Sequence, residues 1–235
     1  METIWLHVRA PFAAFRGFQA GAYRATSPVM PPSAAYGLLL NLAAIEMRQA
    51  VAGPTTLIRA DTPLLRLAIG VVTPSERCSL YQQLHSYPVG DSSAKFKPGT
   101  HGAKYHITPV RREVLVGLNC IIGAQADDRN LFDRVRSGLK GELGITRYGF
   151  PFVGDNNFMI DRIDDVTSPP ETVVWYARMG SDDPPRKGSC RLTVGIDRAD
   201  NSKTTSYLYA PIESGQSEPP DLAWTWTPRE PAVTL

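Results

Sequence analysis

Two histidines, a lysine and a tyrosine lie close together near the middle of the chain, a combination that can cleave RNA without a metal ion. They are His101, Lys104, Tyr105 and His106. A histidine or tyrosine would take the proton of a ribose 2′-hydroxyl, and the lysine would stabilise the charge on the phosphorane. The alternative is a basic loop that only holds phosphate. We favour that alternative, because nothing rigid in this glycine-flanked stretch would fix the side chains.

Cations and aromatic rings are interleaved throughout the surrounding residues 81–112, where Asp91 is the one acid. They are Tyr81, Tyr87, Lys95, Phe96, Lys97, Lys104, Tyr105, Arg111 and Arg112. Cations neutralise phosphates, and aromatic faces stack on unpaired bases. The pattern suits single-stranded RNA as a ligand, but a solvated loop with ordinary surface lysines explains the cations equally well, and only a second such region tips the balance toward RNA.

A second basic and aromatic region, residues 9–24, contains no acid. It leads into a helix that we expect Ser33 to cap, and the N-terminus of a helix is a natural phosphate seat. The candidate RNA-binding residues of this region are Arg9, Arg16, Arg24, Ser33 and Tyr36.

A third region, residues 147–157, resembles the RNP1 pattern of RNA-recognition motifs only superficially, because Pro151 cannot donate to a central strand. We expect a rigid loop beside the sheet. Asn156 and Asn157 can bond backbone or base edges, and a purely structural turn explains both asparagines equally well. The candidates here are Arg147, Tyr148, Phe150, Asn156 and Asn157.

Motifs for other chemistries are missing from the sequence. It contains no Walker or dinucleotide glycine loop, no HExxH, no GxSxG and no paired-cysteine motif. Cys78, Cys120 and Cys190 stand far apart, which argues against a disulfide framework and a structural zinc site. We therefore expect no metal, no cofactor and no catalytic residue.

The elements that must position these residues follow from hydrophobic periodicity. We expect helices over 34–48 and 127–143, the first ended by Gly53-Pro54, and strands over 3–8, 64–72, 113–122, 158–166, 173–179, 191–197 and 204–211. The order predicts an α+β, ferredoxin-like fold with extra C-terminal strands. Residues 1–213 would form a single domain, and the Pro-rich residues 214–235 a surface tail.

The chain has 235 residues, is 43% hydrophobic and carries a formal net charge of only +2. Positive charge for RNA must therefore be local. The prediction of RNA binding requires that these cations line one surface of the protein and are not neutralised by internal ion pairs. Neither a signal peptide nor a run of about 18 apolar residues is visible, so we expect a cytoplasmic protein.

Three blocks of the sequence resemble a known family. They are IWLHVRAPFAAFR, YRATSPVMPPSAAYGLLLNLAAIE and RYGFPFVGDNNFMIDRI. In this order they resemble the fifth CRISPR-associated protein family, of the fruiting-body developmental protein S type found with type I-B-like systems.

This resemblance implies a ferredoxin-like RAMP fold with an inserted β-hairpin thumb at about 75–112. It also implies a subunit of an antiviral Cascade ribonucleoprotein that caps the 5′ handle of the crRNA. Such a subunit docks the first backbone subunit and the large subunit, and meets target DNA through the complex.

One branch of the family, in type I-C systems, cuts the guide precursor with a Tyr/Lys/His set. Lys104, Tyr105 and His106 keep open the alternative of a metal-independent endoribonuclease. Since a separate endoribonuclease normally cuts the precursor in type I-B-like systems, we expect this chain to be inactive.

Overall fold

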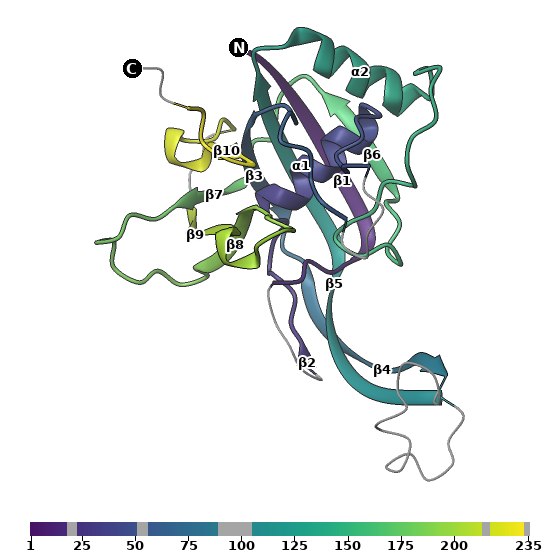
Figure 1. Ribbon diagram of the computed structural model, residues 1–235. Helices are drawn as coiled ribbons and strands as arrows, with labels where there is room; N and C mark the ends of the chain where they lie inside the picture. Colours follow the sequence, from purple (N-terminus) through teal and green to yellow (C-terminus); the bar gives the residue numbers. More distant parts are fainter. Residues whose placement is uncertain (18–22, 51–55, 89–104, 213–216, 233–235) are drawn as a thin grey trace.

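The computed structural model describes residues 1–17, 23–50, 56–88, 105–212 and 217–232, with the backbone alone for 84–88 and 105–108. Within these residues, ten strands form one sheet whose main path has the order β6-β1-β5-β3-β7-β9-β8 (Figure 1). The strands are β1 (Glu2–Ala13), β2 (Tyr23–Arg24), β3 (Leu65–Thr73), β4 (Glu76–Pro88), β5 (Tyr105–Ala126), β6 (Arg162–Val166), β7 (Val174–Arg178), β8 (Cys190–Gly195), β9 (Thr205–Ile212) and β10 (Thr225–Thr227).

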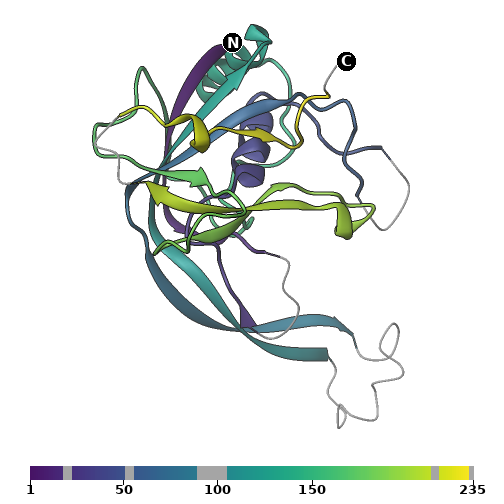
Figure 2. The ribbon, with the colours of Figure 1, turned by 90° about the vertical axis from the view of Figure 1, so that its left-hand side faces the viewer.

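Two helices, α1 (Pro32–Leu42) and α2 (Arg129–Lys140), pack on one face of β6-β1-β5-β3 (Figures 1 and 2). Alternate residues of β1 explain this face: Ile4, Leu6 and Val8 are buried in the core that the helices cover, and the residues between them point to the other face. Among the described residues, no helix is long and apolar enough to span a membrane.

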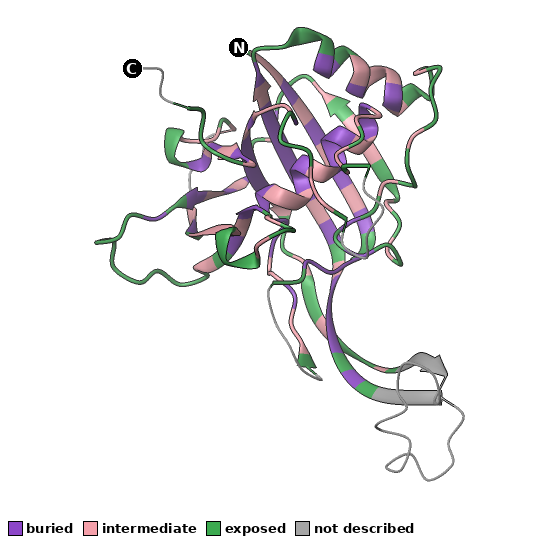
Figure 3. Cartoon of the chain, in the orientation of Figure 1, coloured by how far each residue is buried: buried purple, intermediate pink, exposed green. Residues whose placement is uncertain are grey.

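β5 is longer than the strand expected over 113–122, because its first half pairs with β4, off the main path of the sheet. It runs antiparallel to β4 from Glu76–Val116 to Pro88–Tyr105. We call β4 together with residues 105–116 of β5 the projecting ladder, because it extends away from the core (Figures 1 and 2). Figure 3 shows buried residues concentrated in the central strands and the inner sides of the helices. The polar sequence of the ladder has no apolar alternation that predicts a strand.

α1 begins and ends earlier than the sequence predicts. Pro31 occupies the N-cap position and Pro32 the first turn, where the fixed φ of proline suits a helix, so Ser33 is not the cap. At the other end Ala44 adopts a positive φ of 51° and donates to the Asn41 carbonyl, while the amide of Ile45 donates to Leu40. This pair of bonds is a Schellman motif, which ends the helix well before Gly53-Pro54.

The C-terminal segment is part of the sheet. β10 pairs with Leu65–Leu67 of β3, and the side chain of Thr227 is fully buried. The hydroxyls of Tyr209 and Thr225 lie 2.8 Å apart in the interior. The described residues after 216 therefore include a structural element, where the sequence predicts only a surface tail.

Candidate nucleic-acid interface

Segments from several distant parts of the chain meet where the projecting ladder leaves the core. We call this region the neck and define it as residues 14–16, 23–26, 80–82, 111–113 and 153–158. β2 pairs in parallel with β5, so that Tyr23 lies opposite Arg111 and Arg24 opposite Arg112. On the other side of β5, β4 places Tyr81 opposite Arg111. The topology thus brings the first and second basic regions together.

The buried carboxylate of Glu113 holds β2 against β5. It accepts hydrogen bonds from the Tyr23 hydroxyl at 2.6 Å and from the Thr26 amide at 3.0 Å. Burial by itself raises the pKa of Glu113, but these hydrogen bonds stabilise the charged form, so the pKa lies below its usual value. The Thr26 hydroxyl in turn accepts from the Phe15 amide at 2.8 Å.

A second buried carboxylate, that of Asp155, joins two arginines of the neck. It is 8% exposed, lies 2.5 Å from an Nη of Arg16 and also forms an ion pair with Arg112. Its other oxygen, Oδ1, accepts from the backbone amide of Asn157 at 3.0 Å and from its side-chain amide at 2.9 Å. The DNN sequence is therefore a turn whose aspartate, not its asparagines, contacts the cations.

Arg112 is 4% exposed, unusually deep for a surface cation. Its Nη1 donates to Gln82 at 3.3 Å, and its guanidinium lies 5.4 Å from the ring centre of Phe158. Burial and the neighbouring charges of Arg16 and Arg24 lower the pKa of Arg112. Arg16 and Arg112 thus share one carboxylate while the charge of Arg24 also acts on Arg112, which leaves the neck positive.

Exposed rings flank this charge. Tyr81 and Tyr23, the cross-strand neighbours of Arg111, are 68% and 50% exposed. Arg111 is exposed as well and forms no ion pair with a described residue. Phe12 is 45% exposed, with its ring 6.2 Å from that of Phe158. Rings beside cations are suited to stack on unpaired bases.

Arg9 does not join the neck. Its neighbours Val8 and Ala10 lie in the core under the helices, so Arg9 points to the opposite face of the sheet. There it pairs with Asp164 at 2.9 Å. The expected single track of cations is thus incomplete, and two of its remaining members, Arg16 and Arg112, share a carboxylate.

The loop over residues 147–157 presents Tyr148 and Phe150 to solvent, at 68% and 76% exposure. The guanidinium of Arg48 lies 3.0 Å from the ring centre of Tyr148, and Asn41 donates to the Tyr148 carbonyl at 3.0 Å. Arg147 is half-buried without an ion pair to a described residue, and Asn156 is exposed. The loop is therefore held by α1 and the segment after it.

The two candidates in α1 lie away from the open surface. Tyr36 is only 5% exposed, and its hydroxyl donates to the Pro63 carbonyl at 2.7 Å. Its position in the helix places it on the side that packs on the sheet, so its ring belongs to the core and is not available to RNA. Ser33 is half-buried.

The lysines of the basic region at residues 81–112, Lys95, Lys97 and Lys104, lie outside the described residues. Tyr105 and His106 begin β5, where the backbone alone is described. The residues that sequence reasoning missed are Asp155, Glu113 and Gln82. The signal for Asp155 was present, since an aspartate two residues before an asparagine commonly forms such a turn.

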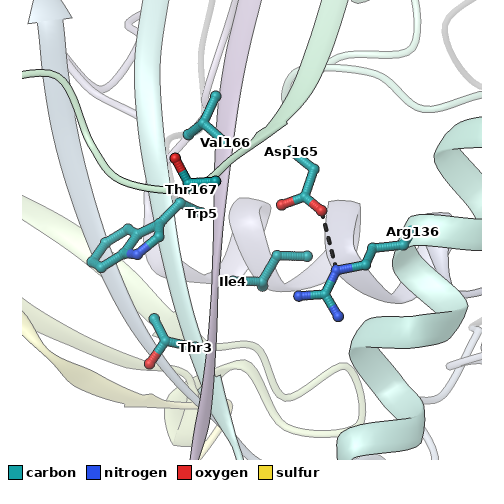
Figure 4. Close-up of a pocket in the computed structure, with 7 residues that line it drawn as sticks. All are labelled: Thr3, Ile4, Trp5, Arg136, Asp165, Val166 and Thr167. Atoms are coloured by element: carbon teal, nitrogen blue, oxygen red, sulfur yellow. Dashed lines mark hydrogen bonds and ion pairs between the residues drawn. The ribbon is translucent and has the colours of Figure 1, made fainter.

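A pocket between β1, β6 and α2 is occupied by paired charges. Figure 4 shows Arg136 pointing to Asp165 from across it. Their nearest N and O atoms are 3.1 Å apart, and Arg136 also pairs with Glu2 and Asp133. This arginine is therefore neutralised and offers no anion site.

Comparisons with known proteins bear on the family and the fold. The family model described as CRISPR-associated protein (Cas_Cas5) matches residues 3–140, more than half of the chain. A solved chain titled "CRISPR RNA-guided surveillance complex" is similar over 90% of this chain and 89% of its own, with a TM-score of 0.57 at 13% identity. Another, titled "Crystal structure of Cas protein", has a TM-score of 0.48 at 12% identity over 90% of this chain and 94% of its own. No curated protein matches by sequence. The extent of the family match shows that this chain belongs to the CRISPR-associated protein (Cas_Cas5) family.

Proposed function

We propose that this chain is a non-catalytic subunit of a type I, I-B-like Cascade complex and that it binds and caps the 5′ handle of the crRNA. The observation that carries the proposal is the positive neck at the base of the projecting ladder, where Arg16 and Arg112 pair with Asp155 and Arg24 lies in register with Arg112 on the adjacent strand. The family match and the similarity to a surveillance-complex chain supply the biological context.

The arrangement of the strands supports a ferredoxin-like core. The four-strand order β6-β1-β5-β3, with α1 after β1 and α2 after β5, is the order of that fold. In this proposal the projecting ladder is the thumb. It separates the handle from the spacer part of the guide, because it rises beside the cations that hold the handle.

The neck can bind a nucleotide chain in two ways. Arginines neutralise phosphates irrespective of sequence, whereas exposed rings take unpaired bases. Arg24 and Arg111 have no ion pair with a described residue, and Tyr81 stands next to Arg111. Docking of the first backbone subunit and the large subunit belongs to the same proposal and draws its support from the family.

The test is to purify the chain and sequence the RNA that copurifies with it, then to measure binding of the handle RNA. We expect intact handle RNA, and we expect Arg24→Gln to weaken binding by about tenfold, the scale of one charge-assisted hydrogen bond. Because phosphates carry no sequence information, the loss should be the same for different RNA sequences. Arg129→Gln, an exposed arginine at the start of α2, is the matched control. Equal binding by Arg24→Gln and wild type would contradict the proposal.

The alternative function, a metal-independent endoribonuclease, makes a distinct prediction for the same protein. Repeat RNA incubated with the chain in the presence of a chelator should remain uncut. Cleavage that is lost in His106→Ala would establish the enzyme and overturn the non-catalytic assignment.

A further inference from the structure

We infer that Arg16, Arg24 and Arg112 form a binding site for a single phosphate group of the nucleotide chain and that Asp155 is its positioning residue. This inference rests on the proposed function, because the phosphate belongs to the RNA that the neck is proposed to hold. It assigns a role in phosphate binding to Asp155, although the carboxylate by itself would repel a phosphate.

Asp155 is placed with little freedom. Gly154 before it has a φ of +80°, and a Cβ at this position would overlap the Ala14 carbonyl. The amide of Ala14 donates to the Val153 carbonyl at 3.2 Å, and the amide of Phe158 donates to the carbonyl of Asp155 at 3.0 Å. The loop is therefore fixed on the end of β1 before the aspartate and closed on itself after it.

The two oxygens of Asp155 have separate partners. Oδ1 accepts both hydrogen bonds from Asn157, whereas Oδ2 faces both arginines. Two guanidinium groups that meet at one oxygen would repel each other without it, and Arg112 is too deeply buried to turn outward into water. The carboxylate thus offsets this repulsion and fixes the direction of both side chains.

Hydrogen-bond donors remain for a ligand after Asp155 is bound. Each guanidinium carries five N–H groups. The side chain of Arg16 is 41% exposed, and the Nε of Arg112 is buried with no hydrogen-bond partner among the described residues. Arg24 lies beside Arg112 on the adjacent strand, in register with it. A phosphate has enough oxygen atoms to accept from all three, and it would find Arg16 and Arg112 already oriented.

The sign of one substitution separates positioning from simple charge. If Asp155 only reduced the local positive charge, Asp155→Asn would strengthen RNA binding, because a repelling charge is removed. If Asp155 orients the arginines, the same change weakens binding despite the gain in net charge. The structure therefore predicts the counterintuitive direction.

The experiment measures binding of 5′-handle RNA to the full chain at several salt concentrations. For Asp155→Asn we expect binding weaker by about tenfold or more. We also expect the slope of log affinity against log salt to become shallower by about 0.7 for each RNA phosphate that the protein no longer neutralises. The matched control is Asp165→Asn, which removes the carboxylate paired with Arg136 in the pocket of Figure 4 and should leave both quantities unchanged.

The outcomes distinguish the two proposals. Suppose that the wild type binds handle RNA. If folded Asp155→Asn then binds as tightly as wild type or more tightly, the inference is overturned and the proposed function still holds. A wild type that does not bind handle RNA overturns both. If Asp155→Asn does not fold, Asp155→Glu decides instead, since it retains the charge that Arg112 needs but moves it by one methylene. Wild-type affinity and salt slope in Asp155→Glu would overturn the inference.

Discussion

Two buried carboxylates, Glu113 and Asp155, organise the neck in different ways. Glu113 binds uncharged donors, the Tyr23 hydroxyl and the Thr26 amide, and so fastens one segment of backbone to β5. Asp155 binds charged donors and so fixes side chains. At the scale of single residues, the first contributes to stability and the second to the geometry of the cations.

The lowered pKa of Glu113 makes its contribution to stability depend on pH. A carboxylate whose pKa is lower in the folded than in the unfolded state stabilises the fold above its unfolded pKa, and this stability is lost as pH falls through the folded value. Glu113→Gln should therefore reduce the free energy of unfolding at pH 7 by about 1–3 kcal/mol, because a neutral amide replaces the charge and keeps only one of the two oxygens that accept from Tyr23 and Thr26.

Urea unfolding of wild type and Glu113→Gln at pH 7 and again at pH 3 would check this prediction. The difference between the two proteins should shrink at the lower pH, where Glu113 is increasingly protonated in both states. A difference that is the same at both pH values would show that the charge of Glu113 is not what stabilises β2 on β5.

At the scale of elements, the projecting ladder is separable from the core. None of the residues from 76 to 109 belongs to a hydrophobic core cluster of the described chain. Its strands are held together chiefly by backbone hydrogen bonds between β4 and β5. The ladder should therefore be dispensable for folding and needed for RNA.

Replacing residues 84–108 with a two-residue Asn-Gly turn tests this separation, because Gln83 and Pro109, which would flank the turn, are paired in the ladder. We expect the thermal unfolding midpoint to stay within a few degrees of wild type, since about 1 kcal/mol corresponds to only ~2–4 °C for a chain of this size. Binding of handle RNA should weaken, because Lys95, Lys97 and Lys104 are removed.

Charge reversal of the same three lysines in the full-length chain separates the effect of charge from that of the ladder's presence. It should weaken RNA binding as the deletion does. RNA retention that survives both changes would mean that the ladder contacts protein and not RNA.

At the scale of the whole molecule, the C-terminal segment joins the central sheet to the outer strands. β10 extends the edge of β3 beyond the short pairing with β7, and Thr225 bonds with Tyr209 of β9. The backbone of Pro228 lies against Gly195 of β8. Removing this segment would uncover Leu65 and Leu67, which are fully buried.

Deletion of residues 217–235 should thus destabilise the protein by about 3 kcal/mol or more, the scale of exposing one or two large apolar side chains. Deletion of residues 231–235 alone is the control and should have little effect, because Pro231 and Ala232 are exposed. Chemical denaturation of the two truncated proteins provides the comparison. Similar stability of the two truncated proteins would show that β10 pairs with the sheet without stabilising it.

The sequence by itself determined what depends on nearby residues. Hydrophobic periodicity located β3, β7, β8 and β9 to within about two residues, and it located α2, which Asp128 caps. Composition and clustering identified the basic regions that contain Arg16, Arg24 and Arg112. These features are local, so one stretch of chain carries the whole signal.

Only the tertiary structure decided which of these residues meet. Arg16, Arg112 and Asp155 are separated by 96 and 43 positions along the chain and meet at one carboxylate oxygen. The side chain of Arg9 points to the opposite face of the sheet, and the ring of Tyr36 lies in the core. Both directions depend on which face the helices cover. β10 and the strands of the projecting ladder likewise form by pairing with segments far away in the sequence. The polar ladder and the three-residue β10 carry no hydrophobic alternation of their own, so no local pattern predicts their pairing.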